Sequence, residues 1–270
     1  MRFTKTRGRS NTPQLNVLDL RKISSEPVSA AYLSRNRAFL LDVPISQCSG
    51  LIGASLEIRS DVDHPYVRTA LEILAGHCSN YEESSLHKFY TSFQPKNAAD
   101  ALGIEIYQSS SLQQFPPHAR VLPWDTMSVK KKSETYIKRV NTGGTSVFGP
   151  VSREKGRLEY NRIRSLLDSI SKTGYYRTNE KDGDIVVHPL LSTSGSIRYE
   201  VTNGAHRVAV LSALRIENVT VRINHSCFAR ENEAAFWPQV QNGTFKQSEA
   251  VHLFRNMFNC IPPWKKRYYE

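Results

Sequence analysis

The stretch TNGAHRVAVL, residues 202–211, constrains the fold most strongly, because two different hydrophobic periods meet there. Before it, the sequence IRYEVT places Ile197, Tyr199 and Val201 at every second position, which is the period of a strand with one buried face. After it, apolar residues recur at helical spacing. The change of period predicts that a strand turns directly into a helix at Gly204.

An elbow of this kind can bind an anion, because it exposes unpaired backbone N–H groups and the positive end of the helix dipole. Gly204 allows a close approach of the backbone, His206 can donate a hydrogen bond or a proton, and Arg207 can make a bidentate contact. A plain Asn-Gly turn, with a capping histidine and a surface arginine, is the alternative that the pattern leaves open. The residues that we expect to bind a phosphoryl group are Asn203, Gly204, Ala205, His206 and Arg207.

The sequence around the elbow predicts a compact series of helices and strands. Ser152 can cap a long helix that ends near Lys172, with Gly174 as its C-terminal stop. The sequences DIVVHPLL, IRYEVT and VTVRIN are typical of strands. The elbow then lies at the carboxyl end of a strand, where open α/β sheets bind their ligands.

Changes in composition divide the chain into five predicted parts. Closely spaced prolines and glycines after residue 115 indicate a linker or a long surface loop. We therefore expect an α+β protein in which a C-terminal α/β domain follows a mainly helical N-terminal region. The parts are a basic flexible tail (1–13), the helical region (14–115), the linker (116–147), the α/β domain (148–225) and a C-terminal helical extension (226–270).

Bulk properties narrow the class of protein. The formal net charge of +11 implies attraction to an anion, such as a nucleotide, a phosphorylated sugar, nucleic acid or an anionic membrane surface. The four cysteines form no CxxC pair, which argues against a zinc site or a disulfide framework. No stretch reaches the apolar length of a transmembrane helix, so we expect no membrane span and a cytoplasmic location.

The sequence from GPVSREKGRLEYNRIRSLL through DIVVHPLL to IRYEVTNGAHRVAVLSALRIENVTVRI resembles the ParB/sulfiredoxin superfamily in the order and spacing of its elements. The resemblance covers about residues 148–225 and is closest in build to the free-serine kinases. It implies a nucleotide-binding domain whose Gly-x-His-Arg motif holds the phosphates of ATP, ADP or CTP together with Mg²⁺. Gly204, His206 and Arg207 are the matching residues in this chain.

Two letters of the motif depart from the family pattern. Sulfiredoxins need a nucleophilic cysteine where this chain has Ala205, which excludes sulfinic-acid reduction. The serine kinases have an aspartate where this chain has Asn203, so a kinase mechanism needs another carboxylate. Glu154 and Glu159 are candidates for that catalytic role, together with His206, although both glutamates also suit ordinary helix contacts.

These features favour a phosphotransferase, a kinase that acts on a small hydroxylated metabolite or sugar, and the overall build suggests polysaccharide synthesis. The alternative is a nucleotide-switched DNA- or protein-binding module without small-molecule chemistry. A DNA-segregation role is weakened, because no helix-turn-helix pattern follows the α/β domain. The N-terminal region offers weak candidates for an acceptor pocket or lid, namely Asp61, Asp63, His64 and His77.

Overall fold

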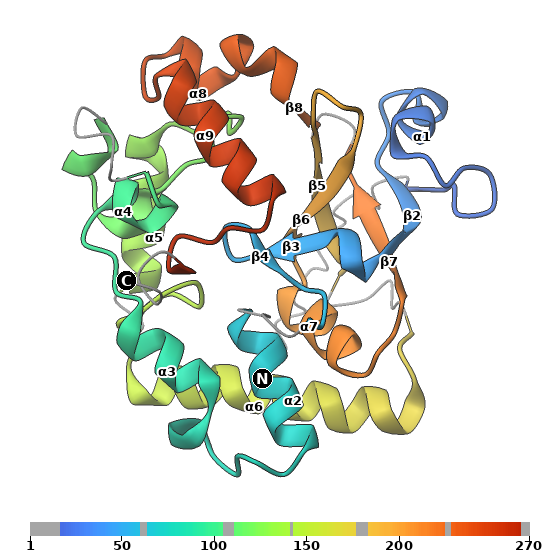
Figure 1. Cartoon of the computed structure of the whole chain (residues 1–270), viewed down its shortest axis with the longest axis vertical. Coiled ribbons are helices and arrows are strands. Elements are labelled where there is room, and N and C mark those ends of the chain that lie inside the picture. The colour runs from blue at the N-terminus through green and yellow to red at the C-terminus, as the bar shows by residue number, and fades with distance from the viewer. Residues whose placement is uncertain are drawn as a thin grey trace, which may run out of the picture.

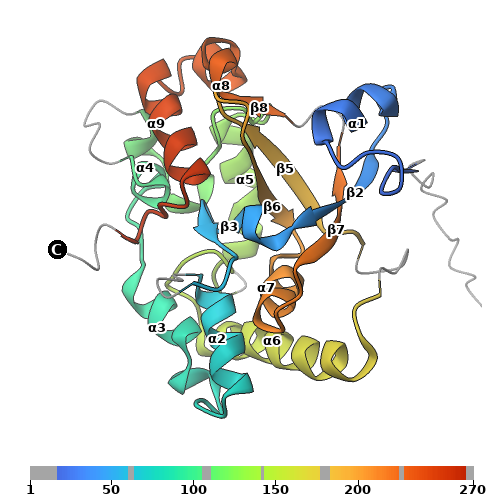
Figure 2. The same ribbon diagram turned by 45° about the vertical axis from the view of Figure 1, so that its right-hand side comes forward.

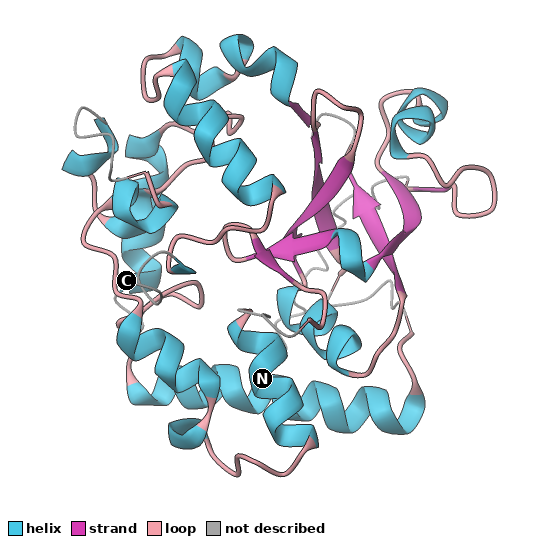
Figure 3. Cartoon of the chain, viewed as in Figure 1, coloured by secondary structure: helices cyan, strands magenta, loops and turns pink. Residues whose placement is uncertain are grey.

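The computed structural model describes residues 17–59, 64–104, 111–140, 143–176, 183–224 and 228–265, which form a mixed β-sheet surrounded by helices (Figure 1). Together these elements confirm the predicted α+β class (Figure 3). The strands are β1 (Leu18–Asp19), β2 (Phe39–Pro44), β3 (Cys48–Gly50), β4 (Ala54–Ser55), β5 (Val186–Leu191), β6 (Ile197–Asn203), β7 (Asn218–Ile223) and β8 (Ala229–Arg230). The α-helices are α1 (Pro27–Ser34), α2 (Pro65–Leu74), α3 (Ser85–Ser92), α4 (Ala98–Leu102), α5 (Val129–Val140), α6 (Arg153–Thr173), α7 (Ala205–Ala213), α8 (Pro238–Gln241) and α9 (Gln247–Phe258).

The sheet takes strands from both halves of the chain. Its order is β1-β2-β7-β5-β6-β3-β4, and β8 pairs with β5. β2 runs antiparallel to β7, with Leu41 opposite Val221, and β3 runs parallel to β6, with Cys48 opposite Tyr199. Strands from the N-terminal region therefore flank the β7-β5-β6 group on both sides.

This arrangement differs from the predicted organisation, in which residues 14–115 and 148–225 form separate regions. The apolar strand β2 is mostly buried, and its backbone groups need hydrogen-bond partners, which the edge of β7 supplies. Helix α5 lies inside the predicted linker of residues 116–147. In the described part of the N-terminal region, the helices α1–α4 are joined by the strands β1–β4, so this region also completes the sheet.

Three helices, α2, α6 and α7, pack against one another at one end of the sheet (Figures 1 and 2). α6 is the longest, and its predicted start is confirmed, because the Ser152 hydroxyl accepts a hydrogen bond from the amide of Lys155 at 3.1 Å. Gly174 follows its last residue, as predicted. These helices bring a segment of the N-terminal region next to the elbow at the start of α7.

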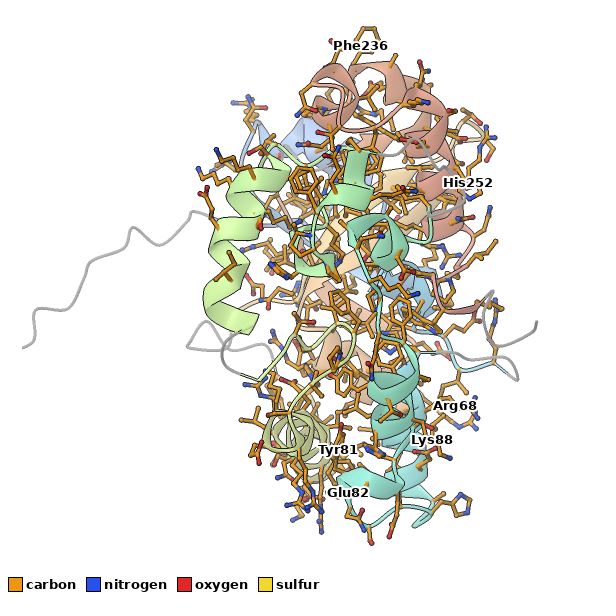
Figure 4. The ribbon with its side chains drawn as sticks, turned by 90° about the vertical axis from the view of Figure 1, so that its left-hand side faces the viewer. Arg68, Tyr81, Glu82, Lys88, Phe236 and His252 are labelled. Atoms are coloured by element: carbon orange, nitrogen blue, oxygen red, sulfur yellow. The ribbon has the colours of Figure 1, made fainter. Side chains whose placement is uncertain are left out.

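α6 also docks closely on the short turn at residues 81–83. A Cβ atom on Gly156 would lie 2.1 Å from Cζ of Tyr81, so only glycine fits at this contact. Beside it, Glu82 binds Arg153 at 2.7 Å and Arg157 at 2.8 Å. Figure 4 shows Tyr81 and Glu82 next to the end of α6.

The buried apolar side chains form two clusters. The larger one joins the sheet to α2, α3, α6 and α7, and the smaller one lies around α4 and α9, with Trp124, Trp237 and Phe254 in contact. Within the parts of the chain that the structure describes, no helix has the length and apolar character needed to cross a bilayer.

Candidate functional site

The elbow forms as the sequence predicts. β6 ends at Asn203, Gly204 adopts the left-handed conformation with φ 86°, and α7 begins at Ala205. A Cβ atom on Gly204 would lie 2.9 Å from Cγ1 of Ile185, so a side chain at this position would both clash and strain the backbone. The N-cap residue of α7 is Gly204, which has no side chain that could cap the first turn. Backbone amides at such a helix start can bind an anion.

A groove with a volume of 840 Å³ lies between this elbow and one face of α6. That volume is within the range of small-molecule sites. Among the described residues that line it, three arginines and a histidine face a single carboxylate, which belongs to Glu154. The lining residues are Glu154, Arg157, Leu158, Asn161, Arg162, Ser165, Leu166, Asn203, Gly204, His206 and Arg207.

Glu159 lies behind the groove and has no exposed surface. One of its carboxylate oxygens, Oε1, contacts Nζ of Lys155 at 2.5 Å and an Nη atom of Arg162 at 2.9 Å. The other, Oε2, lies 2.8 Å from Nε2 of His206. Burial by itself would raise the pKa of Glu159, but the contacts with His206 and Lys155 outweigh it and hold the pKa at about 2. Glu159 is therefore a charged, enclosed carboxylate.

Two contacts hold the imidazole ring of His206, one with Glu159 at its edge and one with Tyr66 on its face. Nε2 of His206 lies 2.8 Å from Oε2 of the ionised Glu159, a close contact that lacks the alignment of a hydrogen bond. The ring of Tyr66 stacks on the imidazole, with 4.3 Å between centroids and 17° between planes. Nδ1 is the nitrogen that Glu159 does not contact, and 20% of the His206 side chain is exposed. A ligand in the groove can thus meet an imidazole of fixed orientation.

Tyr66 itself is buried in α2. Its hydroxyl donates to the carbonyl oxygen of Ser146 at 2.5 Å, and the hydroxyl of Tyr90 donates to the same oxygen at 3.0 Å. His64 packs edge-on against Tyr66 at 5.5 Å. Burial, followed by the charge of His206, lowers the pKa of His64 to about 3, so His64 is neutral at physiological pH.

Arg207 and Asn203 have partners that the sequence did not predict. The Arg207 guanidinium donates to the carbonyl oxygen of Gly183 at 2.8 Å, and the Asn203 amide donates to that of Asp184 at 3.1 Å. Both side chains therefore tie the elbow to the residues that precede β5. Both also line the groove, where their contact with phosphate stays a prediction.

The two candidate glutamates lie in different surroundings. Glu154 is exposed in the first turn of α6 and lines the groove. Its own backbone amide, and then the Ser152 hydroxyl, lower its pKa by hydrogen bonding. Glu159 cannot meet a substrate directly, because it is enclosed and its oxygens face Lys155, Arg162 and His206. Of the pair, Glu154 is the carboxylate that a ligand can reach.

The structure adds residues that sequence reasoning missed, chiefly Tyr66 and Lys155, while the contact of Glu159 with the neighbouring Arg162 is one of the ordinary helix contacts that the sequence allowed. The spacing of Lys155 and Arg162 around Glu159 on one helix is a signal that could have indicated their contacts. No sequence pattern connects Tyr66 to the elbow. Of the weak N-terminal candidates, His64 lies beside Tyr66, His77 is exposed beyond the other end of α2, and Asp61 and Asp63 fall outside the described residues.

The described residues contain no group of three or more His, Cys, Asp or Glu side chains arranged to hold a metal ion. Mg²⁺ commonly uses one or two carboxylates together with substrate phosphates, and Glu154 is placed to provide one such ligand. Comparisons of the chain with protein-family models, with curated proteins and with solved structures gave no match.

Proposed function

We propose that the chain binds a nucleotide at the elbow and acts as a phosphotransferase on a small hydroxylated metabolite or sugar. The observation that carries this proposal is the glycine N-cap at the start of α7, which lines a groove together with three arginines. Backbone amides and fixed cations at a helix N-terminus suit phosphate oxygens. The resemblance of residues 148–225 to the ParB/sulfiredoxin superfamily supports the same ligand, ATP, ADP or CTP.

In this proposal each residue of the groove has a separate role. The amides of Gly204 and Ala205 bind phosphate oxygens, His206 donates a hydrogen bond, and Arg207 adds positive charge beside them. Glu154 holds Mg²⁺ against the phosphates or orients the acceptor hydroxyl. A bound Mg²⁺ would neutralise the charge that develops on the transferred group. Glu159 keeps His206 in place rather than acting as the base.

Arg153 and Arg157 form a matched pair for the test of binding. Both bind Glu82, but only Arg157 lines the groove. We expect Arg157→Ala to weaken nucleotide binding about tenfold, since it removes one charged contact, and Arg153→Ala to leave it unchanged. Titration calorimetry with ATP, ADP and CTP in the presence of Mg²⁺ measures both. Absence of nucleotide binding by the wild-type protein would contradict the proposal.

A second candidate function is a nucleotide-switched module that binds DNA or a protein. The observation that favours it is the single carboxylate among the described lining residues, with an amide at Asn203 where the resembling kinases have an acid. This function predicts nucleotide binding without phosphoryl transfer across a panel of sugars and hydroxylated metabolites. DNA binding that weakens steeply with salt would support it further.

A further inference from the structure

Tyr66 connects the N-terminal region to the groove, although its own ring lies outside the lining. It belongs to α2, and only 1% of it is exposed. Its ring is parallel to the imidazole of His206 within 17°, at the contact distance of stacked rings. Since Glu159 already holds the edge of His206, the stack removes the remaining freedom of the imidazole to rotate.

The hydroxyl of Tyr66 makes a second connection. Its acceptor, the carbonyl of Ser146, belongs to the segment that leads into α6, where the amide of Ser152 donates to the carbonyl oxygen of Gly143 at 2.7 Å. α6 forms one wall of the groove and α7 carries the other. One buried side chain therefore contacts His206 of one wall through its ring and, through its hydroxyl, the segment that leads into the helix of the other wall.

The surroundings of Tyr66 favour a fixed position. His64 packs edge-on against the ring, and burial keeps that histidine neutral, so it adds no positive charge next to His206. The charged groups that face His206 from the neighbouring elements are Glu159 of α6 and, through that carboxylate, Lys155 and Arg162. Tyr66 also holds its hydroxyl proton, because burial and then the charge of Glu159 raise its pKa.

We propose that Tyr66 is a positioning residue of the phosphate site: its ring fixes the plane of His206, and its hydroxyl fixes the separation between the elbow and the start of α6. The inference rests on the proposed function for the identity of the ligand. It makes the N-terminal region part of the site, because α2 supplies the residue that sets the geometry of a motif on α7.

The first test uses the protein without nucleotide and records the ring nitrogens of ¹⁵N-labelled histidines by NMR. We expect one His206 signal set, the same in the wild type and in Tyr66→Phe, which keeps the ring. Tyr66→Leu should shift this set and broaden it, because the imidazole regains motion. Tyr90→Phe is the matched control, since Tyr90 donates to the same Ser146 oxygen without stacking on His206. A wild-type His206 spectrum in Tyr66→Leu would overturn the role of the ring.

The second test measures the affinity for ADP and its dependence on pH by calorimetry in the same four proteins. We expect Tyr66→Leu to bind about tenfold more weakly with an altered pH profile, Tyr66→Phe about threefold more weakly, and Tyr90→Phe as the wild type. If Tyr66→Leu does not fold, equal affinities of Tyr66→Phe and Tyr90→Phe overturn the role of the hydroxyl. A wild type that binds no ADP contradicts the proposed function, while the spectra still decide whether Tyr66 positions His206.

Discussion

Glu159 and Glu200 are both buried glutamates, and the regions around them shift their pKa values in opposite directions. Glu159 belongs to α6 and contacts Lys155, Arg162 and His206, and its pKa is about 2. Glu200 lies on β6 and is 6% exposed. It accepts a hydrogen bond from the Ser49 hydroxyl at 3.1 Å, and burial raises its pKa to about 7 against the weaker effects of Ser49, the Ile52 amide and Arg120.

The difference shows what keeps a buried carboxyl charged in this protein. A hydroxyl and an amide do not offset the loss of water around Glu200, whereas direct contact with cations more than offsets it around Glu159. The Glu159 carboxylate, which is charged at neutral pH, lies behind the groove. The Glu200 carboxyl, whose pKa is about 7, lies in the sheet. Each carboxylate can be replaced by a neutral amide, and the two substitutions should change the free energy of unfolding in opposite directions.

The largest effect is expected for Glu159→Gln. Removing the charge leaves His206, Lys155 and Arg162 without their shared carboxylate, and we expect the free energy of unfolding at about pH 7 to fall by roughly 3–4 kcal/mol. The folded-state pKa lies below the unfolded value of 4.5, so this stability is present above about pH 4.5 and is lost as the pH falls through about 2. Urea unfolding of both proteins measures it.

Glu154→Gln is the control for that experiment, because Glu154 lies on the same helix but is exposed. It should leave the free energy of unfolding unchanged. A loss of stability in Glu154→Gln as large as that in Glu159→Gln would mean that the cations around Glu159 are not what stabilises this region.

Glu200→Gln should act in the opposite direction. The folded-state pKa of Glu200, about 7, lies above the unfolded value of 4.5, so the folded protein holds an extra proton in that window and loses stability as the pH rises through it. We expect Glu200→Gln to be more stable than the wild type by about 3 kcal/mol at about pH 8 and of similar stability at about pH 4. Urea unfolding as a function of pH gives both values.

The free energy of unfolding of Glu200→Gln must be compared with that of the wild type at each pH. The pKa values of His64 and His188 are lowered by burial to about 3 and about 4, so these histidines add stability as the pH rises toward 6.5 and partly mask Glu200. Their contributions cancel in the difference between the two proteins. A difference that does not change between acid and alkaline pH would contradict the raised pKa of Glu200.

The smallest effect is expected for Ser49→Ala. Loss of the hydroxyl removes one hydrogen bond to the Glu200 carboxylate, which should cost about 1 kcal/mol at about pH 8, where Glu200 is charged. The same substitution in the Glu200→Gln background tests whether the two residues interact. If the cost is the same at about pH 5 and about pH 8, the Ser49 hydroxyl does not act through the charge of Glu200.

Local features of the fold were predictable from the sequence. The change of period before Gly204 predicted the elbow, and the structure confirms its left-handed glycine and the helix that follows. Ser152 and Gly174 predicted the ends of α6 for equally local reasons, since capping depends on residues within one turn. The groove follows in part from these two helices.

Features that depend on distant parts of the chain were not predictable in this way. The stack of Tyr66 on His206 joins α2 to α7, and nothing in the residues around Tyr66 specifies a partner so far along the sequence. The same holds for Arg207, whose charge indicated an anion while its guanidinium contacts backbone carbonyls of residues that precede β5. Nothing in the residues of β2 indicates that β7, far along the sequence, would lie beside it.

The pairing of β2 with β7 has a consequence for how the chain is made. The Thr220 hydroxyl donates to the Asp42 carboxylate across this pair, between residues 178 positions apart. During synthesis, the edge of β2 that pairs with β7 stays open until β7 has emerged, and an open edge of an apolar strand is prone to aggregate. We therefore expect the nascent chain to be most prone to aggregate between the emergence of β2 and that of β7.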